Sequence, residues 1–135
     1  MALLDTNVLL DIATGDPTWA VWSLRATEAA AAEGPLYVNS VIYAELAVRY
    51  ERAAEVDELI KAVGAEFAHI PPAAAFLAAK AFAGCRAAGG AKSGVLPDFF
   101  IGAHAAAVGI RLLTRDARRY RTYFPAVSLI SPNLN

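Results

Sequence analysis

The chain has 135 residues and a formal net charge of -1, and its 57% apolar and 19% charged residues exclude a disordered chain. This length suits one domain, residues 1–135, with its own hydrophobic core. The lone cysteine, Cys85, excludes an internal disulfide, and the charge-free residues 122–135 are too few to span a membrane, so we expect a cytoplasmic protein without a secretory leader.

Short apolar runs alternate with segments of helical periodicity along the whole chain. In chain order these patterns predict a strand at residues 2–4, a helix capped by Thr6, a turn at 14–17, a helix ending near 33 and a strand at 36–38. Helices beginning at Ser40 and near 53, a strand at 67–70, a helix at 73–88 and a glycine-rich flexible loop at 89–94 follow. The last elements are a helix from 98 to 109, a strand at 110–114, a short helix near 116 and a strand at 127–130. Because short apolar strands that alternate with helices form parallel sheets covered on both faces, we predict an α/β fold. It is a three-layer α/β/α sandwich around a parallel sheet of about five strands.

Four acidic residues occupy positions that this architecture makes informative. Asp5 and Asp116 follow predicted strands, and the carboxyl edge of an open parallel sheet is where ligands bind. Asp98 lies in the first turn of a nearly apolar helix. Glu45 lies on a helix face that we predict it shares with Val41 and Val48.

Carboxylates on otherwise buried faces are costly unless something pairs with them. The sequence offers no obvious lysine or arginine partner for these four acids, and they would raise one another's pKa values. A divalent cation resolves this repulsion, and hard oxygen ligands suit Mg²⁺ or Mn²⁺. Asp5 and Asp98 alone also fit helix N-termini, and Asp116 alone fits a turn. Neither a cap nor a turn explains Glu45 in mid-helix among apolar neighbours, and the four acids together favour one metal site.

Four segments carry a resemblance to a known family. Residues 3–7 (LLDTN), 43–46 (YAEL), 96–103 (LPDFFIGA) and 112–116 (LLTRD), the last followed by Tyr120, resemble the four acidic motifs of PIN domains in the right order. A small stand-alone chain of this kind resembles VapC-type toxins most. The departures are minor, with Gly102 where alanine is commoner.

The resemblance implies hydrolysis of RNA phosphodiester bonds with Mg²⁺ or Mn²⁺ held by Asp5, Glu45, Asp98 and Asp116. Thr6, Asn7 and Thr114 would orient carboxylates or waters. The basic residues lie mostly from Lys80 onward, eight against two acids. Arg115, Arg118, Arg119 and Arg121 are therefore the candidates for RNA phosphates, although ordinary solvated helix faces explain the charge asymmetry equally well.

The resemblance also implies partners. The chain would form a homodimer and be inhibited by a small VapB-type antitoxin that inserts a segment into the acidic groove. Two alternatives stay open: a catalytically silent PIN-like domain that binds RNA or protein, and a haloacid-dehalogenase-like phosphatase. The phosphatase needs an aspartate two residues after Asp5, where this chain has Asn7.

Several other residues are interpreted as structural. His104 on an apolar helix is predicted to be a satisfied core histidine, and Cys85 a small apolar helix residue. Asp11 and Asp16 are predicted to be exposed helix or turn acids. The glycines before Lys92 do not form a phosphate loop, because the lysine does not follow the required glycine.

Overall fold

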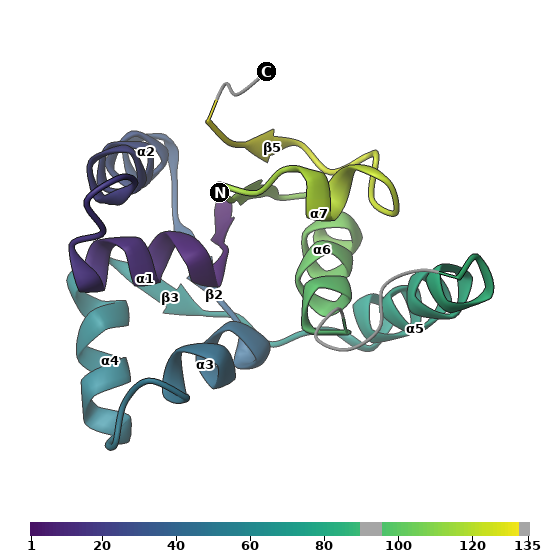
Figure 1. The fold of residues 1–135 in the computed structure, drawn as a ribbon, viewed down its shortest axis with the longest axis horizontal. Coiled ribbons are helices and arrows are strands. Elements are labelled where there is room, and N and C mark those ends of the chain that lie inside the picture. Colours follow the sequence, from purple (N-terminus) through teal and green to yellow (C-terminus); the bar gives the residue numbers. More distant parts are fainter. Residues whose placement is uncertain (90–95, 133–135) are drawn as a thin grey trace.

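The computed structural model describes residues 1–89 and 96–132, and its strands form one parallel sheet through the centre of the molecule (Figure 1). The strands are β1 (Ala2–Leu4), β2 (Leu36–Val38), β3 (Ala65–Phe67), β4 (Arg111–Leu113) and β5 (Leu129–Ile130). Their order across the sheet is β3-β2-β1-β4-β5, and each neighbouring pair is parallel. The predicted five-stranded parallel sheet is confirmed.

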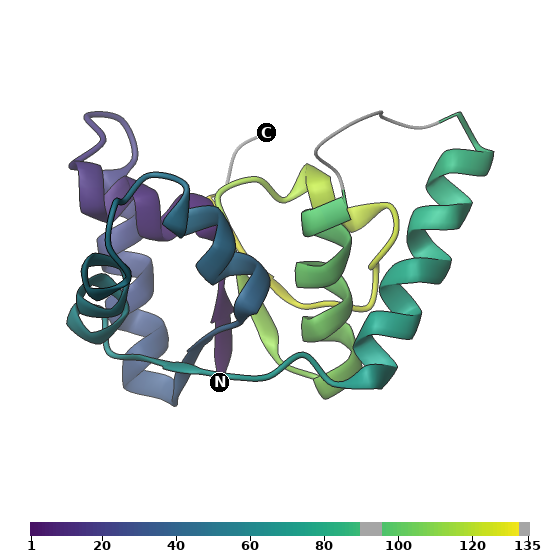
Figure 2. The same ribbon diagram turned by 90° about the horizontal axis from the view of Figure 1, so that it is seen from below.

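Helices cover both faces of this sheet. They are α1 (Thr6–Thr14), α2 (Ala20–Glu33), α3 (Ser40–Ala47), α4 (Ala53–Ala62), α5 (Pro72–Ala87), α6 (Leu96–Val108) and α7 (Arg118–Arg121). In Figure 2, α1, α2 and α4 stand on one side of the central strands, and α5 and α6 stand on the other. The three-layer α/β/α arrangement predicted from the sequence is confirmed.

The central strand β1 is completely buried, because it has a strand on each side and helices on both faces. Ala2, Leu3 and Leu4 are each 0% exposed, as expected for an apolar strand inside a parallel sheet. Leu4 pairs with Leu113 of β4. The carboxyl ends of β1 and β4 therefore lie side by side, and the chain segments that follow them begin at the same edge.

Two helix caps differ from the prediction by one residue. Asp5, rather than Thr6, is the N-cap of α1, and its side chain accepts a hydrogen bond from the Thr6 N–H. Asn39, rather than Ser40, caps α3 by accepting from the Ile42 N–H. Both Asp5 and Asn39 sit in extended backbone, the conformation in which a capping side chain accepts from the first N–H groups of a helix.

The edge strands are shorter or shifted compared with the prediction. The strand expected at residues 67–70 spans Ala65–Phe67 instead. Gly64, with a left-handed φ of 76°, ends the preceding helical segment and lets the strand begin at once. The last strand is confined to Leu129–Ile130, because the Val127 N–H bonds back to Phe124 in a turn. Residues 90–95, which include most of the predicted glycine-rich loop, lie outside the described residues.

Two residues interpreted as structural are confirmed in that role. Cys85 is a buried residue of α5. His104 is 2% exposed, and its Nδ1 accepts a hydrogen bond from the Asn39 side-chain amide at 2.9 Å. Burial lowers the pKa of His104. No helix within residues 1–89 and 96–132 is long and apolar enough to cross a membrane.

Candidate active site

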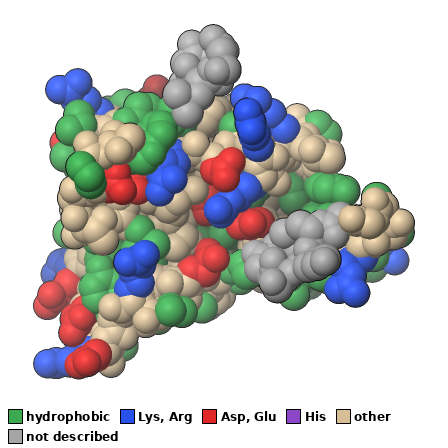
Figure 3. Space-filling model, viewed as in Figure 1, with side chains coloured by type: hydrophobic (Ala, Val, Ile, Leu, Met, Phe, Trp, Pro, Cys, Tyr) green, Lys and Arg blue, Asp and Glu red, His purple; other side chains and the backbone are tan. Residues whose placement is uncertain are grey.

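The candidate site lies at the carboxyl edge of the sheet, between the neighbouring strands β1 and β4, whose chain connections lead to opposite sides. From β1 the chain continues to β2 and β3 on one side, whereas β4 and β5 lie on the other. Such a switch point leaves a crevice for ligands in open α/β sheets. The view of Figure 1 looks onto this edge, and Figure 3 shows acidic side chains near its centre with basic side chains among them.

Asp5 is the most enclosed acid of the site. The residue is only 1% exposed, and its carboxylate accepts several hydrogen bonds. Oδ2 accepts from the Thr114 hydroxyl at 2.8 Å, the Tyr120 hydroxyl at 2.8 Å and the Asn7 amide at 3.3 Å. Oδ1 accepts from the Thr6 N–H at 2.8 Å. Burial raises the pKa of Asp5, and these donors oppose the rise.

Tyr120 is the site residue whose role the sequence did not assign. It is completely buried on the short helix α7, and its hydroxyl points to Asp5. Burial and the neighbouring Asp5 carboxylate raise the pKa of Tyr120 far above its ordinary value, so the phenol stays a hydrogen-bond donor. The signal was present as the tyrosine after the fourth motif, but nothing in the sequence spacing aims it at Asp5.

Asp98 shows that the four acids share one electrostatic environment. It lies in the first turn of α6 with its side chain 16% exposed. Burial raises the pKa of Asp98 to about 6, Arg119 opposes that rise, and Asp5, Glu45 and Asp116 add to it. The predicted set of acids therefore comes together, because each of the other three carboxylates is near enough to disfavour ionisation of Asp98.

Arg119 corrects the expectation that these acids have no basic partner. Its Nε donates to Asp116 Oδ2 at 2.9 Å, and its Nη1 donates to Asp98 Oδ1 at 3.4 Å. The sequence placed Arg119 among the candidates for RNA phosphates. In the structure the guanidinium instead links two of the four acids, so it already supplies one positive charge to them.

Glu45 reaches the site by a different route from the one predicted. Val48, expected on the same helix face, is 86% exposed, because α3 ends at Ala47 and its buried residues are Ile42 and Leu46. Glu45 is half-buried, and its Oε1 accepts from the Thr6 hydroxyl at 2.6 Å. The shared apolar face was therefore wrong, whereas the position of Glu45 beside the start of α1 follows from this hydrogen bond.

The other predicted arginines differ in their surroundings. Arg118 and Arg121 are exposed on α7. Arg115 forms an ion pair with Asp11, with Nε 2.8 Å from Oδ2. Asp11 was predicted to be exposed, and this is wrong: the residue is 2% exposed. Asp16 is a turn acid as predicted, since its carboxylate accepts from the Trp19 N–H at 2.8 Å, but it is half-buried rather than exposed.

A hard divalent cation needs several oxygen ligands around one point. Within residues 1–89 and 96–132, no three acidic, histidine or cysteine side chains lie close enough to ligate one ion as they stand. The Arg119 guanidinium donates to both Asp98 and Asp116, so it lies between these two carboxylates. The chemistry of the donors nevertheless fits Mg²⁺ or Mn²⁺: burial and the Asp5, Glu45 and Asp116 carboxylates raise the pKa of Asp98, so a cation would be favoured there.

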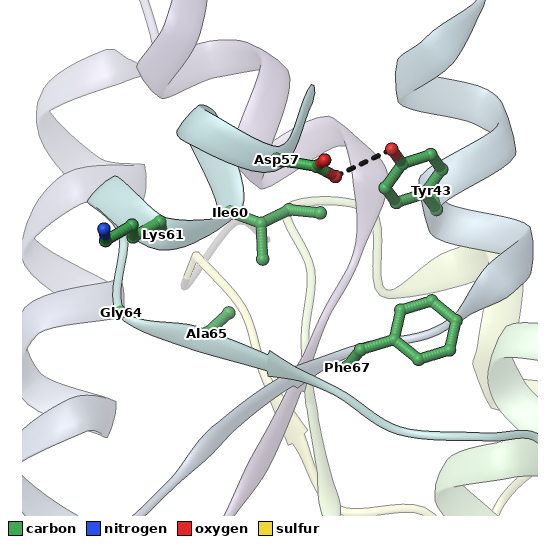
Figure 4. A pocket seen from close by; sticks show the side chains of 7 residues that line it. All are labelled: Tyr43, Asp57, Ile60, Lys61, Gly64, Ala65 and Phe67. Carbon is green, nitrogen blue, oxygen red and sulfur yellow. Dashed lines mark hydrogen bonds between the residues drawn. The ribbon is translucent and has the colours of Figure 1, made fainter. Parts of the chain in front are cut away.

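The second motif also contributes to a hollow away from the acids. Tyr43 lies two residues before Glu45, yet it lines an open cavity of about 380 Å³ between α3, α4 and β3 (Figure 4). Its hydroxyl donates to Asp57 at 2.7 Å, and Phe67 forms an edge-on contact with its ring. This hollow is lined mainly by apolar atoms and holds none of the four acids.

Comparisons with known proteins agree with the fold. The family model of the PIN domain matches residues 2–125, so the chain belongs to the PIN-domain family. A comparison with curated protein sequences finds no match.

Among solved structures, the chain is similar to VapBC2 from Rickettsia felis, a complex bound to a promoter DNA fragment. The sequence identity is 17% and the TM-score is 0.71, and the match covers 96% of this chain and 97% of that chain. It is similar to VapBC-1 from nontypeable Haemophilus influenzae with 14% identity, a TM-score of 0.72 and coverage of 96% of both chains. It is also similar to a toxin–antitoxin complex from Klebsiella pneumoniae with 20% identity, a TM-score of 0.66 and coverage of 100% of both chains. At these identities the likeness concerns the fold.

Proposed function

We propose that this PIN domain is a metal-dependent ribonuclease that hydrolyses RNA phosphodiester bonds at the carboxyl edge of its sheet. The observation that carries the proposal is the raised pKa of Asp98, which burial raises most and to which Asp5, Glu45 and Asp116 add. Four carboxylates from distant parts of the chain repel one another at one switch point. Groups whose pKa is raised by burial together with neighbouring charges are concentrated at functional sites, which supports a functional role for Asp98.

The residues of the site divide into fixed and available groups. Asp5 is fixed by the hydroxyls of Thr114 and Tyr120, and Glu45 is held by Thr6. Asp98 and Asp116 are bonded to the Arg119 side chain, which is 47% exposed and has solvent into which it can turn.

We assign Mg²⁺, with Mn²⁺ as a substitute, to the four acids. Such an ion, when bound, lowers the pKa of a water and offsets charge on the phosphate. Asp98 and Asp116 would bind it once the guanidinium leaves them, and Asp5 would present a carboxylate already oriented by its donors. Asn7, which donates to Asp5, would restrict the same carboxylate. Arg118, Arg119 and Arg121 are our candidates for RNA phosphates.

We further propose that the chain is the toxin of a toxin–antitoxin pair. The support is that the solved structures it resembles along nearly their full length are VapBC and other toxin–antitoxin complexes. The partner would be a small VapB-type antitoxin, and the toxin would act in the cytoplasm as a homodimer. Co-purification with the product of the neighbouring gene, followed by light scattering of the complex and of the free chain, tests this part. A monomer at all concentrations that ignores the neighbouring product contradicts it.

Cleavage of end-labelled structured RNAs tests the ribonuclease. The native chain, Asp98→Asn and Glu45→Gln are each incubated with Mg²⁺, with Mn²⁺ and with a chelator. Glu58→Gln is the matched control, because Glu58 is an exposed acid of α4. We expect the native chain and the control to cleave RNA in either metal, and we expect the chelator and both site substitutions to abolish cleavage.

Two other outcomes would contradict parts of the proposal. Cleavage that survives both the chelator and Asp98→Asn places the chemistry elsewhere. RNA binding without cleavage in any metal supports a silent binding domain, for which the neutralisation of two acids by Arg119 would be the structural reason. Hydrolysis of small phosphomonoesters would revive the phosphatase, although Asn7 offers an amide where that chemistry needs a second carboxylate.

A further inference from the structure

We infer that Arg115 is a positioning residue that holds the Asp116 segment against α1, with the buried Asp11 as its fixed counter-charge. The inference rests on the proposed function, because it concerns the same acidic site. It replaces an RNA-contact role for Arg115, which lies between Thr114 and Asp116, with a role that acts through Asp116.

The contact between Arg115 and Asp11 is a paired and largely desolvated one. Arg115 Nε lies 2.8 Å from Asp11 Oδ2, and Nη2 lies 3.0 Å from Oδ1. The Asp11 side chain is 3% exposed, and its Oδ2 also accepts from the Ser23 hydroxyl at 2.9 Å. The guanidinium carbon lies 5.6 Å from the centre of the Trp19 ring. A side chain held by two carboxylate oxygens and an aromatic ring has a defined position.

The same segment is attached to α1 at a second point. The Arg115 N–H donates to the Asn7 side-chain oxygen at 3.3 Å. Asn7 and Asp11 are four residues apart on α1, so their side chains leave the helix on the same face. One contact holds the Arg115 backbone and the other holds its side chain. Both therefore fix the segment to the helix that begins at Asp5.

These attachments determine where Asp116 lies. The Asp116 N–H donates to the Thr114 hydroxyl at 3.0 Å, and that hydroxyl donates to Asp5 at 2.8 Å. The segment 114–116 thus lies between Asp5 and Asp11, and the Asp116 carboxylate projects from it. Without the ion pair, Thr114 still holds one end of the segment, but the other end loses its side-chain anchor. Asp116 would keep its bonds to Thr114 and Arg119 but would be held less firmly relative to Asp5.

The buried Asp11 explains why a lysine cannot replace Arg115. A carboxylate at 2% exposure is costly unless it is paired with good geometry. Lysine keeps the charge but not the planar, two-point contact. If Arg115 instead contacted RNA, lysine would preserve most of the phosphate attraction, and Asp11 would have no influence on metal binding. The two roles therefore predict opposite results for Arg115→Lys and Asp11→Asn.

The first experiment measures amide hydrogen exchange by NMR in the presence of a chelator. Native chain, Arg115→Lys and Asp11→Asn are compared, with Arg25→Gln as the control because Arg25 is an exposed arginine of α2 outside the acidic site. We expect exchange of the Arg115 and Asp116 amides to become about tenfold faster or more in both test variants, while β1 stays protected. Unchanged exchange in Arg115→Lys would overturn the inference, whether or not the chain binds metal.

The second experiment titrates the same proteins with Mn²⁺ in a calorimeter. Loss of a residue that orients a metal ligand costs about 10–100-fold in metal affinity, and we expect this loss in both test variants but not in the control. The double variant should lose no more than either single one, because the two side chains act as a pair. If the native chain binds Mn²⁺ and the variants bind it equally well, the inference is wrong. If the native chain binds none, the proposed function fails, and the exchange measurement still decides the role of Arg115.

Discussion

Replacement of Asp98 by asparagine should make the metal-free protein more stable at neutral pH, while it removes the proposed activity. Asparagine has nearly the shape of aspartate but carries no charge. Asp98 is mostly buried, and three other carboxylates raise its pKa. An ionised Asp98 therefore costs free energy in the folded state, and the substitution removes that cost.

The size of the effect follows from the pKa. A carboxyl whose pKa rises from 3.8 to about 6 on folding loses at most about 3 kcal/mol of folding free energy at pH 7.5, since one pKa unit corresponds to about 1.4 kcal/mol. The sign follows from the direction: the contribution is favourable below the unfolded pKa and is lost as the pH rises through about 6. The contact with Arg119 is already included in that pKa, and solvent at the partly exposed site reduces the gain below this upper bound. We expect a net gain of about 1–2 kcal/mol.

The assay is urea unfolding of native chain and Asp98→Asn in a chelator at several pH values between 4 and 7.5. The difference between the two proteins isolates Asp98, because the other acids titrate in both. It should grow as the pH rises through about 6. The exposed Glu58→Gln control should stay within about 0.5 kcal/mol of the native chain.

One result would refute this reasoning. If Asp98→Asn is less stable than the native chain at pH 7.5, or if the difference does not change with pH, the ionised carboxylate is not disfavoured by its surroundings. The electrostatic link between Asp98 and the other three acids would then be wrong.

Three further predictions concern single side chains. Gly102→Ala should destabilise the protein by about 1–3 kcal/mol in thermal or urea unfolding, because a Cβ there would lie 2.4 Å from a ring carbon of Phe124. Gly84→Ala on α5 should instead stabilise it by up to about 1 kcal/mol, since a Cβ there meets nothing within 4 Å. Equal effects at the two glycines would contradict the close packing of Gly102 against Phe124. Arg119→Gln should tighten Mn²⁺ binding by about tenfold in calorimetry, because it removes a positive charge from the acids, and weaker binding would show that Arg119 supports the metal.

The sequence predicted the elements that carry the site because their signals are local. An apolar run that stops at Asp5 indicates a buried strand with an acid at its end, and β1 and α1 follow that pattern. The same holds for Asp98 at the start of an apolar helix. The order of strands then brings the two acids together, since parallel strands end at one edge. Gly102 is explained by the close approach of Phe124, which no local pattern reveals.

The contacts that neutralise charge could not be predicted in the same way. The ion pair of Arg115 with Asp11 joins residues 104 positions apart, and its geometry depends on how α1 lies against the end of β4. The bond from Arg119 to Asp116 spans three residues and is a spacing that the sequence does show. Its extension to Asp98 depends on the packing of α6 against α7. The expected lack of a basic partner is therefore wrong at Asp116, where the local spacing provides one, and at Asp98, where helix packing provides one.

A crystal structure of the native chain grown in Mn²⁺ tests most directly whether the four acids bind one shared metal centre. Anomalous scattering identifies manganese independently of any assumption about the ligands. We expect a peak among Asp5, Glu45, Asp98 and Asp116, at distances of about 2.0–2.3 Å from carboxylate oxygens, with Arg119 turned away from Asp98. A site without manganese at saturating concentration, with the guanidinium still between Asp98 and Asp116, would contradict the account.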